Sequence, residues 1–278
     1  MQSMSSLHFT EARTKSEVDA VQRYRYDVLV GELEIPLLSD PRVRRDVSSF
    51  DNLASSHLVV VHRGDELVAT ARLALPNPEV AAACGARFGF ELEYEFALER
   101  LTSFSCGLAE IARLAVRRDR KGPGVVSKLY EGLYAFSRSL GVTHWIGAVD
   151  CQTSRRVEAS TMHRWLGARN LVSSEFAIVA RETVERVSSH SSQPAPRMPF
   201  PSEPVVNQQG VEPTLATTIT HFVTALNARA IGEPARHPGF PGRFVLPMLV
   251  SLDALPKATL ARFDQSSIAP PVPVQRAC

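Results

Sequence analysis

The clearest pattern of apolar and polar positions lies between residues 107 and 150. Residues 108–116 are rich in apolar, strand-forming side chains, and a glycine loop at 122–124 ends that run. Apolar residues then recur at helical spacing over 125–140, and 142–149 is a second apolar run. The pattern predicts a strand, a helix and a second strand. A crossover of this length favours parallel pairing of the two strands.

Parallel pairing would place the N-terminus of the 125–140 helix at the carboxyl edge of the sheet. Free N–H groups and the helix dipole attract anions there. Four cations precede this helix: Arg117, Arg118, Arg120 and Lys121. This basic loop suits a pyrophosphate or phosphopantetheine arm, although a solvated turn would contain the same residues. It is not a P-loop, because no Lys-Ser/Thr pair follows its last glycine, and no GxGxxG fingerprint is present.

The remaining pattern predicts further elements on both sides of this unit. Ser16 can cap a helix that runs to about Leu33, with Asp19 completing a variant capping box. Two strands at 58–62 and 67–75 would form a hairpin around Gly64 and Asp65. The other expected elements are an acidic helical region at 79–100, a helix at 156–166, a strand at 171–180, a helix at 215–230, a strand at 243–252 and a helix at 255–263.

The proline pattern suggests how the chain is divided. Six prolines between 194 and 213 alternate with Ser and Gln, which opposes regular structure. We therefore expect a catalytic core over 1–187 and a linker or mobile loop over 188–213. A helix-strand-helix extension at 214–264 would pack on the core, followed by a Pro-rich tail at 265–278.

Composition narrows the function only a little. The chain has 278 residues, 44% of them hydrophobic, which is enough for a sizeable core. A net charge of +2 gives no general attraction to nucleic acid. No apolar run is long enough to span a bilayer and no signal-peptide pattern is present, so we expect a cytoplasmic protein. The four cysteines lack the spacing of a zinc site or a disulfide framework, and we expect neither a metal nor a disulfide.

Several short motifs occur in an order that is typical of one enzyme family. They are Arg25-Tyr26-Asp27-Val28-Leu29-Val30-Gly31-Glu32, Phe50-Asp51, His57-Leu58-Val59-Val60, Ala71-Arg72-Leu73 and Glu110-Ile111-Ala112-Arg113. In order and spacing they resemble the acyl-homoserine-lactone synthases, the long-chain N-acyl amino acid synthases and the acyltransferases of ornithine-lipid synthesis. The basic loop approximates the arginine/glycine loop of GNAT-type acyltransferases, although Asp119 stands where that motif begins with Arg or Gln. The resemblance covers about residues 16–263.

The resemblance implies a GNAT-type α/β fold: a mixed twisted sheet flanked by helices, with a C-terminal α/β extension. It also implies an N-acyltransferase that moves a medium- or long-chain acyl group from an acyl carrier protein or coenzyme A to the amine of an amino acid. If the protein is an enzyme, the alternative function is autoinducer synthesis. Residues 225–234 and 244–252 disfavour it because they look like the amino-acid-acylating branch. If the protein is not an enzyme, the alternative is a noncatalytic module that binds an acyl thioester or carrier protein.

Glu110 is the best candidate for the base that removes the amine proton. A carboxylate on a central strand beside a desolvated site can have a raised pKa suited to this task. The other interpretation is that Glu110 only pairs with an arginine. Arg113 is three residues away, so a regular strand would place it on the opposite face. Either Arg113 serves a different set of contacts, or a bulge re-aims it, as is common at this strand of GNAT folds.

The resemblance also assigns residues to the two substrates. It places the donor thioester along the strand end and the basic loop, at Leu114, Ala115, Val116, Arg117, Arg118, Arg120, Lys121, Gly122, Gly124 and Val125. It places Arg25, Leu29, Asp51 and Arg72 around the acceptor, although Arg25, Asp51 and Arg72 could equally form a structural ion-pair network.

Ser48 stands where a second acid is usual, and Leu29 where an aromatic is usual. The missing acid predicts an acceptor with an uncharged side chain.

Two further residues are candidates for proton transfer or nucleophilic chemistry. His163 occupies approximately the place of the tyrosine with which many GNAT enzymes protonate the departing thiolate, and an imidazole can do the same. An exposed helix histidine is the alternative interpretation. Cys151 follows Asp150 and could suggest a thiol nucleophile, but no patterned histidine accompanies it, which favours an inert buried cysteine.

Overall fold

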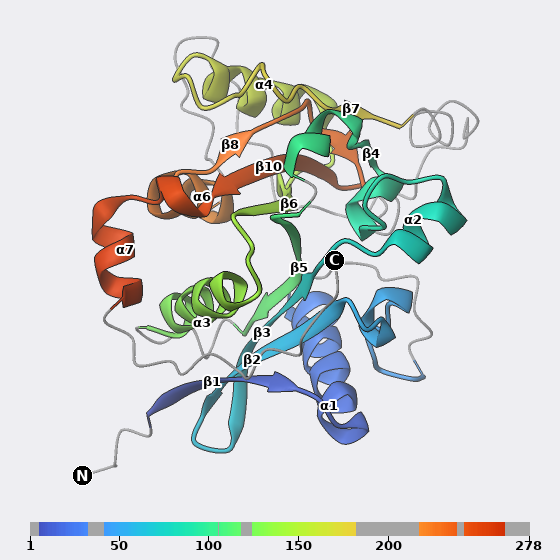
Figure 1. Cartoon of the computed structure of the whole chain (residues 1–278), viewed down its shortest axis with the longest axis vertical. Coiled ribbons are helices and arrows are strands. Elements are labelled where there is room, and N and C mark those ends of the chain that lie inside the picture. Colours follow the sequence, from blue (N-terminus) through green and yellow to red (C-terminus); the bar gives the residue numbers. More distant parts are fainter. Residues whose placement is uncertain are drawn as a thin grey trace, which may run out of the picture.

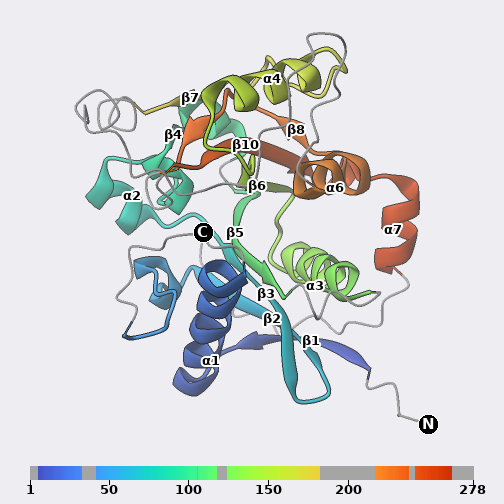
Figure 2. The same cartoon turned by 180° about the vertical axis from the view of Figure 1, so that it is seen from behind.

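The computed structural model describes residues 6–32, 42–104, 106–117, 124–181, 217–237 and 242–264. Within these residues the chain forms one large sheet with helices on both faces, seen from opposite sides in Figures 1 and 2. The strands of this sheet are β1 (Leu7–Ala12), β2 (Ser56–Arg63), β3 (Glu66–Ala74), β5 (Leu108–Val116), β6 (His144–Asp150), β8 (Arg229–Ala230), β9 (Ala235–Arg236) and β10 (Phe244–Ser251). The predicted fold class, a mixed α/β sheet flanked by helices, is confirmed.

The strand order is β1-β2-β3-β5-β6-β10-β8, and β9 also pairs with β10. Neighbouring strands are antiparallel except for β5 and β6, which pair in parallel. The predicted strand-helix-strand crossover at 107–150 is therefore confirmed, with α3 (Val125–Ser139) as its helix. β10 pairs with β6 from Val245↔Asp150 to Ser251↔His144, so the C-terminal part of the chain extends the same sheet.

The two parallel strands separate partway along their length. They are paired only from Leu108↔His144 to Glu110↔Ile146, although both strands continue beyond that point. Gly147 lies close to β5 where the strands diverge, and a Cβ built on it would come within 2.6 Å of the Ile111 carbonyl oxygen. The opening between the strands thus begins directly after Glu110.

Helices cover the two faces of the sheet (Figures 1 and 2). They are α1 (Lys15–Tyr26), α2 (Pro78–Cys84), α3, α4 (Arg156–Gly167), α6 (Thr217–Leu226) and α7 (Lys257–Asp264). The alternation along β2 shows how the faces are divided: Val59 and Val61 share a core cluster with α3, whereas Leu58 and Val60 pack with Val21 of α1. This period of two is what a strand buried on both faces requires.

A second apolar cluster covers the α1 face further along the sheet. Phe90, Phe96 and Leu101 of the segment between α2 and β5 pack there on Leu108 and Ile146. A small two-stranded sheet, β4 (Phe96–Ala97) with β7 (Val179–Ala180), belongs to this layer. The α1 face therefore carries one apolar cluster under α1 and another under this segment, and the polar residues described below lie on that face.

Several predicted boundaries were wrong. The cap of α1 is Thr14 and its box partner is Glu17, because the Glu17 carboxylate accepts from the Thr14 N–H at 2.8 Å while the Thr14 hydroxyl accepts from the Glu17 N–H at 3.3 Å. The α-helix ends at Tyr26 and continues only as a π-helical turn, Asp27–Glu32.

Other predicted elements are shorter than expected. The region 79–100 contains one α-helix, α2, followed by a 3₁₀ turn, Glu91–Tyr94, and β4. The expected strand at 171–180 is reduced to β7, and the helix at 215–230 ends at Leu226. The linker at 188–213 and the tail at 265–278 lie outside the described residues. None of the helices in the described part of the chain has both the length and the apolar character needed to cross a bilayer.

Candidate active site

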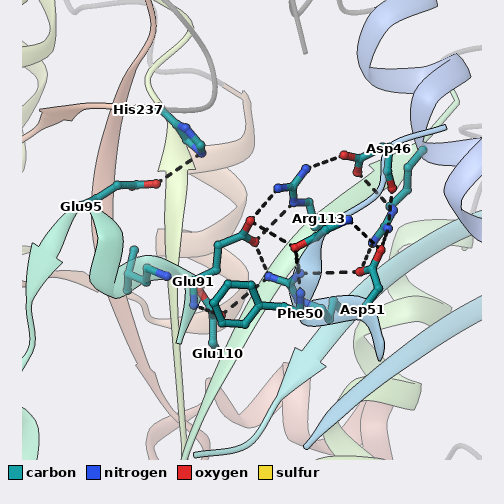
Figure 3. A network of polar contacts seen from close by, with 12 residues as sticks. Asp46, Phe50, Asp51, Glu91, Glu95, Glu110, Arg113 and His237 are labelled. Atoms are coloured by element: carbon teal, nitrogen blue, oxygen red, sulfur yellow. Dashed lines mark hydrogen bonds and ion pairs between the residues drawn. The ribbon is translucent and has the colours of Figure 1, made fainter. Parts of the chain in front are cut away.

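Two central strands carry the core of a buried polar network. Arg72 of β3 lies opposite Ala112 of β5, and Ala74 lies opposite Glu110, so Arg72 and Glu110 share the α1 face of the sheet. Both are almost fully buried, with 0% and 3% of their surface exposed. Figure 3 shows how residues from other segments converge on them. Such burial requires that each charge find a partner.

A bulge in β5 brings Arg113 to the same face. Ala71 of β3 lies opposite both Arg113 and Leu114, and Arg113 adopts a left-handed backbone with a φ of 53°. The inserted residue shifts the alternation by one, so that Ala115 packs with Tyr24 of α1 and Val28 of the π-helical turn. Of the two alternatives raised by the sequence, the bulge is therefore the correct one.

Arg25 anchors α1 to the network. Its side chain is fully buried and donates to both carboxylate oxygens of Asp51, with Nη1–Oδ1 at 3.2 Å and Nη2–Oδ2 at 2.5 Å. Its Nε lies 3.2 Å from Asp46 Oδ2, and Gln22 also donates to Asp51. Burial opposes ionisation of Asp51, but Arg25 and Arg72 outweigh it and lower the pKa of that carboxyl.

Glu91 bridges the other two arginines. It pairs with Nη2 of Arg72, and its Oε1 accepts from Nη2 of Arg113 at 2.6 Å. Arg113 also bonds Asp46 at 2.5 Å, while Arg72 donates to the Ser48 hydroxyl at 3.0 Å. Burial disfavours the charged form of Glu91, yet the two guanidinium groups hold its pKa at about 2. Glu91 is therefore ionised throughout the physiological pH range.

Glu110 has a different electrostatic environment. Its two oxygens accept backbone N–H groups, that of Glu91 at 3.1 Å and that of Leu92 at 2.8 Å, while the Arg72 guanidinium is 3.9 Å away. Burial, together with the negative charge of Glu91, raises the pKa of Glu110 to about 7 despite Arg72 and the two backbone donors. A carboxyl group with this pKa can both accept and release a proton near neutral pH.

Sequence-based prediction missed three of the five acidic residues at the site. Asp46, Glu91 and Glu95 are buried or partly buried beside the three arginines, and His237 lies 3.4 Å from Glu95. All four lie in short or irregular segments, where no periodicity marks a residue as inward-facing. The acidic composition of 79–100 is the signal that the sequence offers, and a helix over that range does not show which of its acids face inward.

Ser48 takes part in the polar network although it carries no charge. Its hydroxyl accepts from Arg72 and donates to Glu91 Oε1 at 3.4 Å, so the position is part of the network without a charge of its own. Asp46 and Glu91 supply negative charge on either side of it. Five carboxylates (Asp46, Asp51, Glu91, Glu95 and Glu110) surround three guanidinium groups (Arg25, Arg72 and Arg113). The acid that is missing at Ser48 is therefore offset by carboxylates beside it, and the prediction of an uncharged acceptor has to take them into account.

The predicted donor-binding residues are only partly described. Leu114, Ala115 and Val116 form the end of β5, Val125 begins α3 after Gly124, and the Arg117 guanidinium lies 3.2 Å from Glu32. The N-terminus of α3 has no side-chain cap among the described residues. Arg118, Arg120, Lys121 and Gly122 lie outside the described residues. Leu29 is buried in the π-helical turn.

Two other candidates lie apart from this network. His163 is on α4. Burial lowers its pKa, and the negative charge of Glu233 opposes that shift. Within the described residues His163 takes no part in the hydrogen bonds and ion pairs that join the three arginines. Burial raises the pKa of the Cys151 thiol to about 12, which leaves it protonated at neutral pH. The structure thus favours the interpretation of Cys151 as an inert buried thiol.

Residues 24–131 match the family model of the acetyltransferase (GNAT) domain. The resemblance to GNAT-type acyltransferases inferred from the sequence is therefore confirmed for this region. This matched region contains Arg25, Asp51, Arg72, Glu110 and Arg113.

The chain is similar to a curated protein and to solved structures. The L-ornithine N(alpha)-acyltransferase of Rhizobium meliloti (strain 1021) is 28% identical over 192 residues, which are 66% of this chain and 63% of that protein. The chain thus aligns with less than two thirds of the length of this curated relative. A CoA-dependent acyl-homoserine lactone synthase, BjaI, solved with MTA, has the same fold, with 15% identity, coverage of 97% and 94%, and a TM-score of 0.50. FeeM, an N-acyl amino acid synthase from uncultured soil microbes, gives 9% identity, coverage of 90% and 92%, and a TM-score of 0.49.

Proposed function

We propose that this chain is an N-acyltransferase that moves an acyl group from a thioester to the amine of an amino acid. The reaction needs a base to deprotonate the acceptor ammonium, a place for the thioester and an exit for the thiol. The amine nitrogen forms a bond to the thioester carbonyl carbon, the C–S bond breaks, and one proton is released for each amide and thiol formed. The observation that carries this proposal is the buried Glu110 at the point where β5 and β6 separate.

Glu110 takes the proton of the acceptor ammonium, directly or through a water molecule. With a pKa of about 7 it is ionised in about half of the molecules at neutral pH, and its two backbone donors fix the orientation of the carboxylate. Glu91 serves instead as a permanent anion beside it. Of the five carboxylates Glu91 is the most exposed, with 20% of its side chain accessible against at most 5% for the other four. An ammonium group can approach Glu110 along this edge.

The opening between β5 and β6 supports a donor with a long, thin arm. Backbone groups that no longer pair across the two strands can bond such an arm and polarise the thioester carbonyl. The α3 N-terminus and the basic loop follow the end of β5, which suits an anionic group at the far end of the arm. We propose coenzyme A or the phosphopantetheine of an acyl carrier protein as the carrier. The CoA-dependence of the lactone synthase with the same fold favours coenzyme A.

The charge of the site favours a cationic acceptor. Glu110 must be ionised to act as a base, which leaves more carboxylates than guanidinium groups among the described residues. An acceptor with an additional ammonium group compensates this excess, whereas an uncharged side chain does not. The similarity to an L-ornithine N(alpha)-acyltransferase points the same way. We propose a dibasic amino acid such as ornithine, acylated on one amine.

Product mass tests this function directly. The purified chain is incubated with acyl-CoA or acyl carrier protein thioesters of several lengths and a mixture of amino acids, and thiol release is followed in parallel. We expect a product whose mass equals acyl donor plus amino acid, minus the thiol carrier. Glu110→Gln is the matched control, because it keeps the shape of the side chain but cannot accept the proton. Absence of thiol release with every donor and acceptor would refute the proposal, and a lactone product from S-adenosylmethionine would replace it with autoinducer synthesis.

A further inference from the structure

Glu95 and His237 form a pair that the proposed reaction does not use, and the negative charge of Glu110 acts on Glu95. Glu95 is 3% exposed and ends the 3₁₀ turn that carries Glu91. Its Oε1 is 3.4 Å from His237 Nε2, and its Oε2 is buried without a hydrogen-bond partner within the described residues. Figure 3 shows this pair on the opposite side of Glu91 from Arg113 and Asp46. A buried carboxylate oxygen with no donor is expensive to keep ionised, so the arrangement needs an explanation.

Backbone hydrogen bonds hold both residues of the pair in place. The Glu95 carbonyl accepts the Arg181 N–H at 2.8 Å, directly after β7. His237 follows β9, which pairs with β10, and its N–H donates to the Arg243 carbonyl at 3.0 Å. The histidine thus comes from the β6–β10 side of the sheet, whereas Glu110 is on β5. The pair lies toward the other side of the opening that begins after Glu110.

The reaction creates a need that this pair could fill. Each turnover leaves one proton on Glu110, whose side chain is 4% exposed. That proton must reach water before the next ammonium can be deprotonated. Glu95 is also sealed, with 5% of its side chain exposed, but His237 is more accessible at 17%. Exposure therefore increases from Glu110 and Glu95 outward to the imidazole.

The charges around the pair suit proton transfer. Burial, and then the negative charges of Glu110 and Glu91, raise the pKa of Glu95 well above its usual range, against the opposing effect of Arg113. Burial, and then the Arg113 guanidinium, lower the pKa of His237 to about 4, while Glu91 opposes that shift. Both shifts favour a proton on Glu95 and a neutral imidazole on His237. A carboxylate whose pKa is raised in this way can accept the proton of a nearby carboxyl group.

We propose that Glu95 and His237 form a proton relay that carries the proton of Glu110 to solvent. This inference rests on the proposed function. The Glu95–His237 pair releases its proton from the imidazole to water or buffer, and the Glu110 carboxyl then passes its own proton to the Glu95 carboxylate, through a water molecule where the gap requires one. Glu110 is again ionised and the pair again holds one proton. No bond other than those to the proton changes, and the acceptor is water or buffer base.

Chemical rescue distinguishes a relay from a structural role. We expect His237→Ala to lower kcat at least roughly tenfold at low buffer concentration, within the usual range for a proton-transfer group, with both KM values unchanged. Added imidazole should restore kcat, because it can take the proton at the position of the missing ring. Glu95→Gln should lower kcat similarly without rescue, because its defect lies inside the protein. His62→Gln, at the far end of β2, is the matched control and should behave as wild type.

The failure of the relay and the failure of the function give different results. If wild type forms the amide and Glu110→Gln does not, but Glu95→Gln and His237→Ala both retain wild-type kcat at low buffer, the relay is wrong and the function stands. A loss in His237→Ala that imidazole does not relieve also overturns the relay. Glu95→Gln keeps the test valid if His237→Ala does not fold, because glutamine resembles the protonated carboxyl. If wild type releases no thiol at all, the proposed function itself fails.

Discussion

Glu110 and Arg113 are three residues apart on one strand, yet both contact Glu91. The Glu91 N–H donates to Glu110 at 3.1 Å, and the Glu91 carboxylate accepts from Arg113 at 2.6 Å. A flat strand would send the two side chains to opposite faces, and the bulge at Arg113 removes that conflict. The bulge thus joins a permanent ion pair to a carboxyl group that titrates near neutral pH.

The base assignment predicts a particular pH dependence. If Glu110 must be ionised to accept the proton, kcat/KM for the acceptor should rise with pH through an apparent pKa near 7. Glu110→Gln should lower kcat by roughly 10²- to 10⁴-fold and abolish this limb of the profile, with little change in donor KM. Steady-state rates between pH 5 and 9 measure both effects. A Glu110→Gln enzyme with wild-type rates and the same profile would contradict the assignment.

The same carboxyl group should make the protein less stable as pH rises. Its pKa is about 7 when folded and about 4.5 when unfolded, so the folded state binds more protons between these values. The free energy of unfolding contributed by Glu110 is therefore fully present below pH 4.5 and falls until about pH 7, by about 3 kcal/mol. Denaturant unfolding of wild type and Glu110→Gln should show this difference growing across that range in favour of the variant. A constant difference would mean that Glu110 does not titrate as described.

The opening between β5 and β6 depends on a small residue. A Cβ on Gly147 would meet the Ile111 carbonyl at 2.6 Å, one residue beyond Glu110. Gly147→Ala should therefore shift β5, lower stability by about 1–3 kcal/mol and reduce kcat. Gly31→Ala is a matched control, because nothing lies within 4 Å of its added Cβ. Thermal denaturation and steady-state rates check both variants, and a fully active Gly147→Ala would mean that this close approach does not position Glu110.

The sequence predicted the parts of the site that lie on regular strands. Glu110 and Arg72 could be placed because β3 and β5 have clear apolar patterns, and the pairing of the two strands sets which face they share. Glu91 and Glu95 could not be placed, because the 3₁₀ turn that carries them has no pattern that separates buried from exposed positions. His237 reaches the site only through the pairing of β9 with β10, a contact between residues close in sequence but far from Glu110.

The N-terminal cap of α1 shows a further limit of prediction from the sequence. Ser16 and Thr14 are both good capping residues within two positions, and only the reciprocal bonds between Thr14 and Glu17 decide between them. The bulge at Arg113 was likewise one of two possibilities that the sequence allowed. A bulge could be expected there, because the strand that carries Glu110 commonly bulges in the GNAT folds that the sequence resembles. Nothing in the sequence excluded a regular strand.

The basic loop should contribute to donor binding. Replacing Arg117, Arg118, Arg120 and Lys121 with alanine removes the cations that precede the α3 N-terminus, so the KM for an anionic donor should rise and its dependence on salt should weaken. Initial rates at several salt concentrations, with acyl-CoA and with acyl carrier protein, measure this. Arg138→Ala is the control, because Arg138 is an exposed arginine in the last turn of the same helix. An unchanged donor KM at low salt would leave the loop as a solvated turn.

Acceptor choice should follow the charge of the site. Glu91 has a pKa of about 2 and 20% of its side chain is exposed, so it presents a permanent negative charge at the accessible edge of the network. When Glu110 ionises as well, an acceptor with a second ammonium group gains an attraction that glycine, leucine or tyrosine cannot obtain. In a competition for one acyl donor we therefore expect ornithine to have the highest kcat/KM. Its advantage should shrink in high salt, because partly exposed charges are screened. A preference for leucine or tyrosine would instead mean that Arg72 and Arg113 fully neutralise Glu91, and that the absence of a charge at Ser48 decides the acceptor after all.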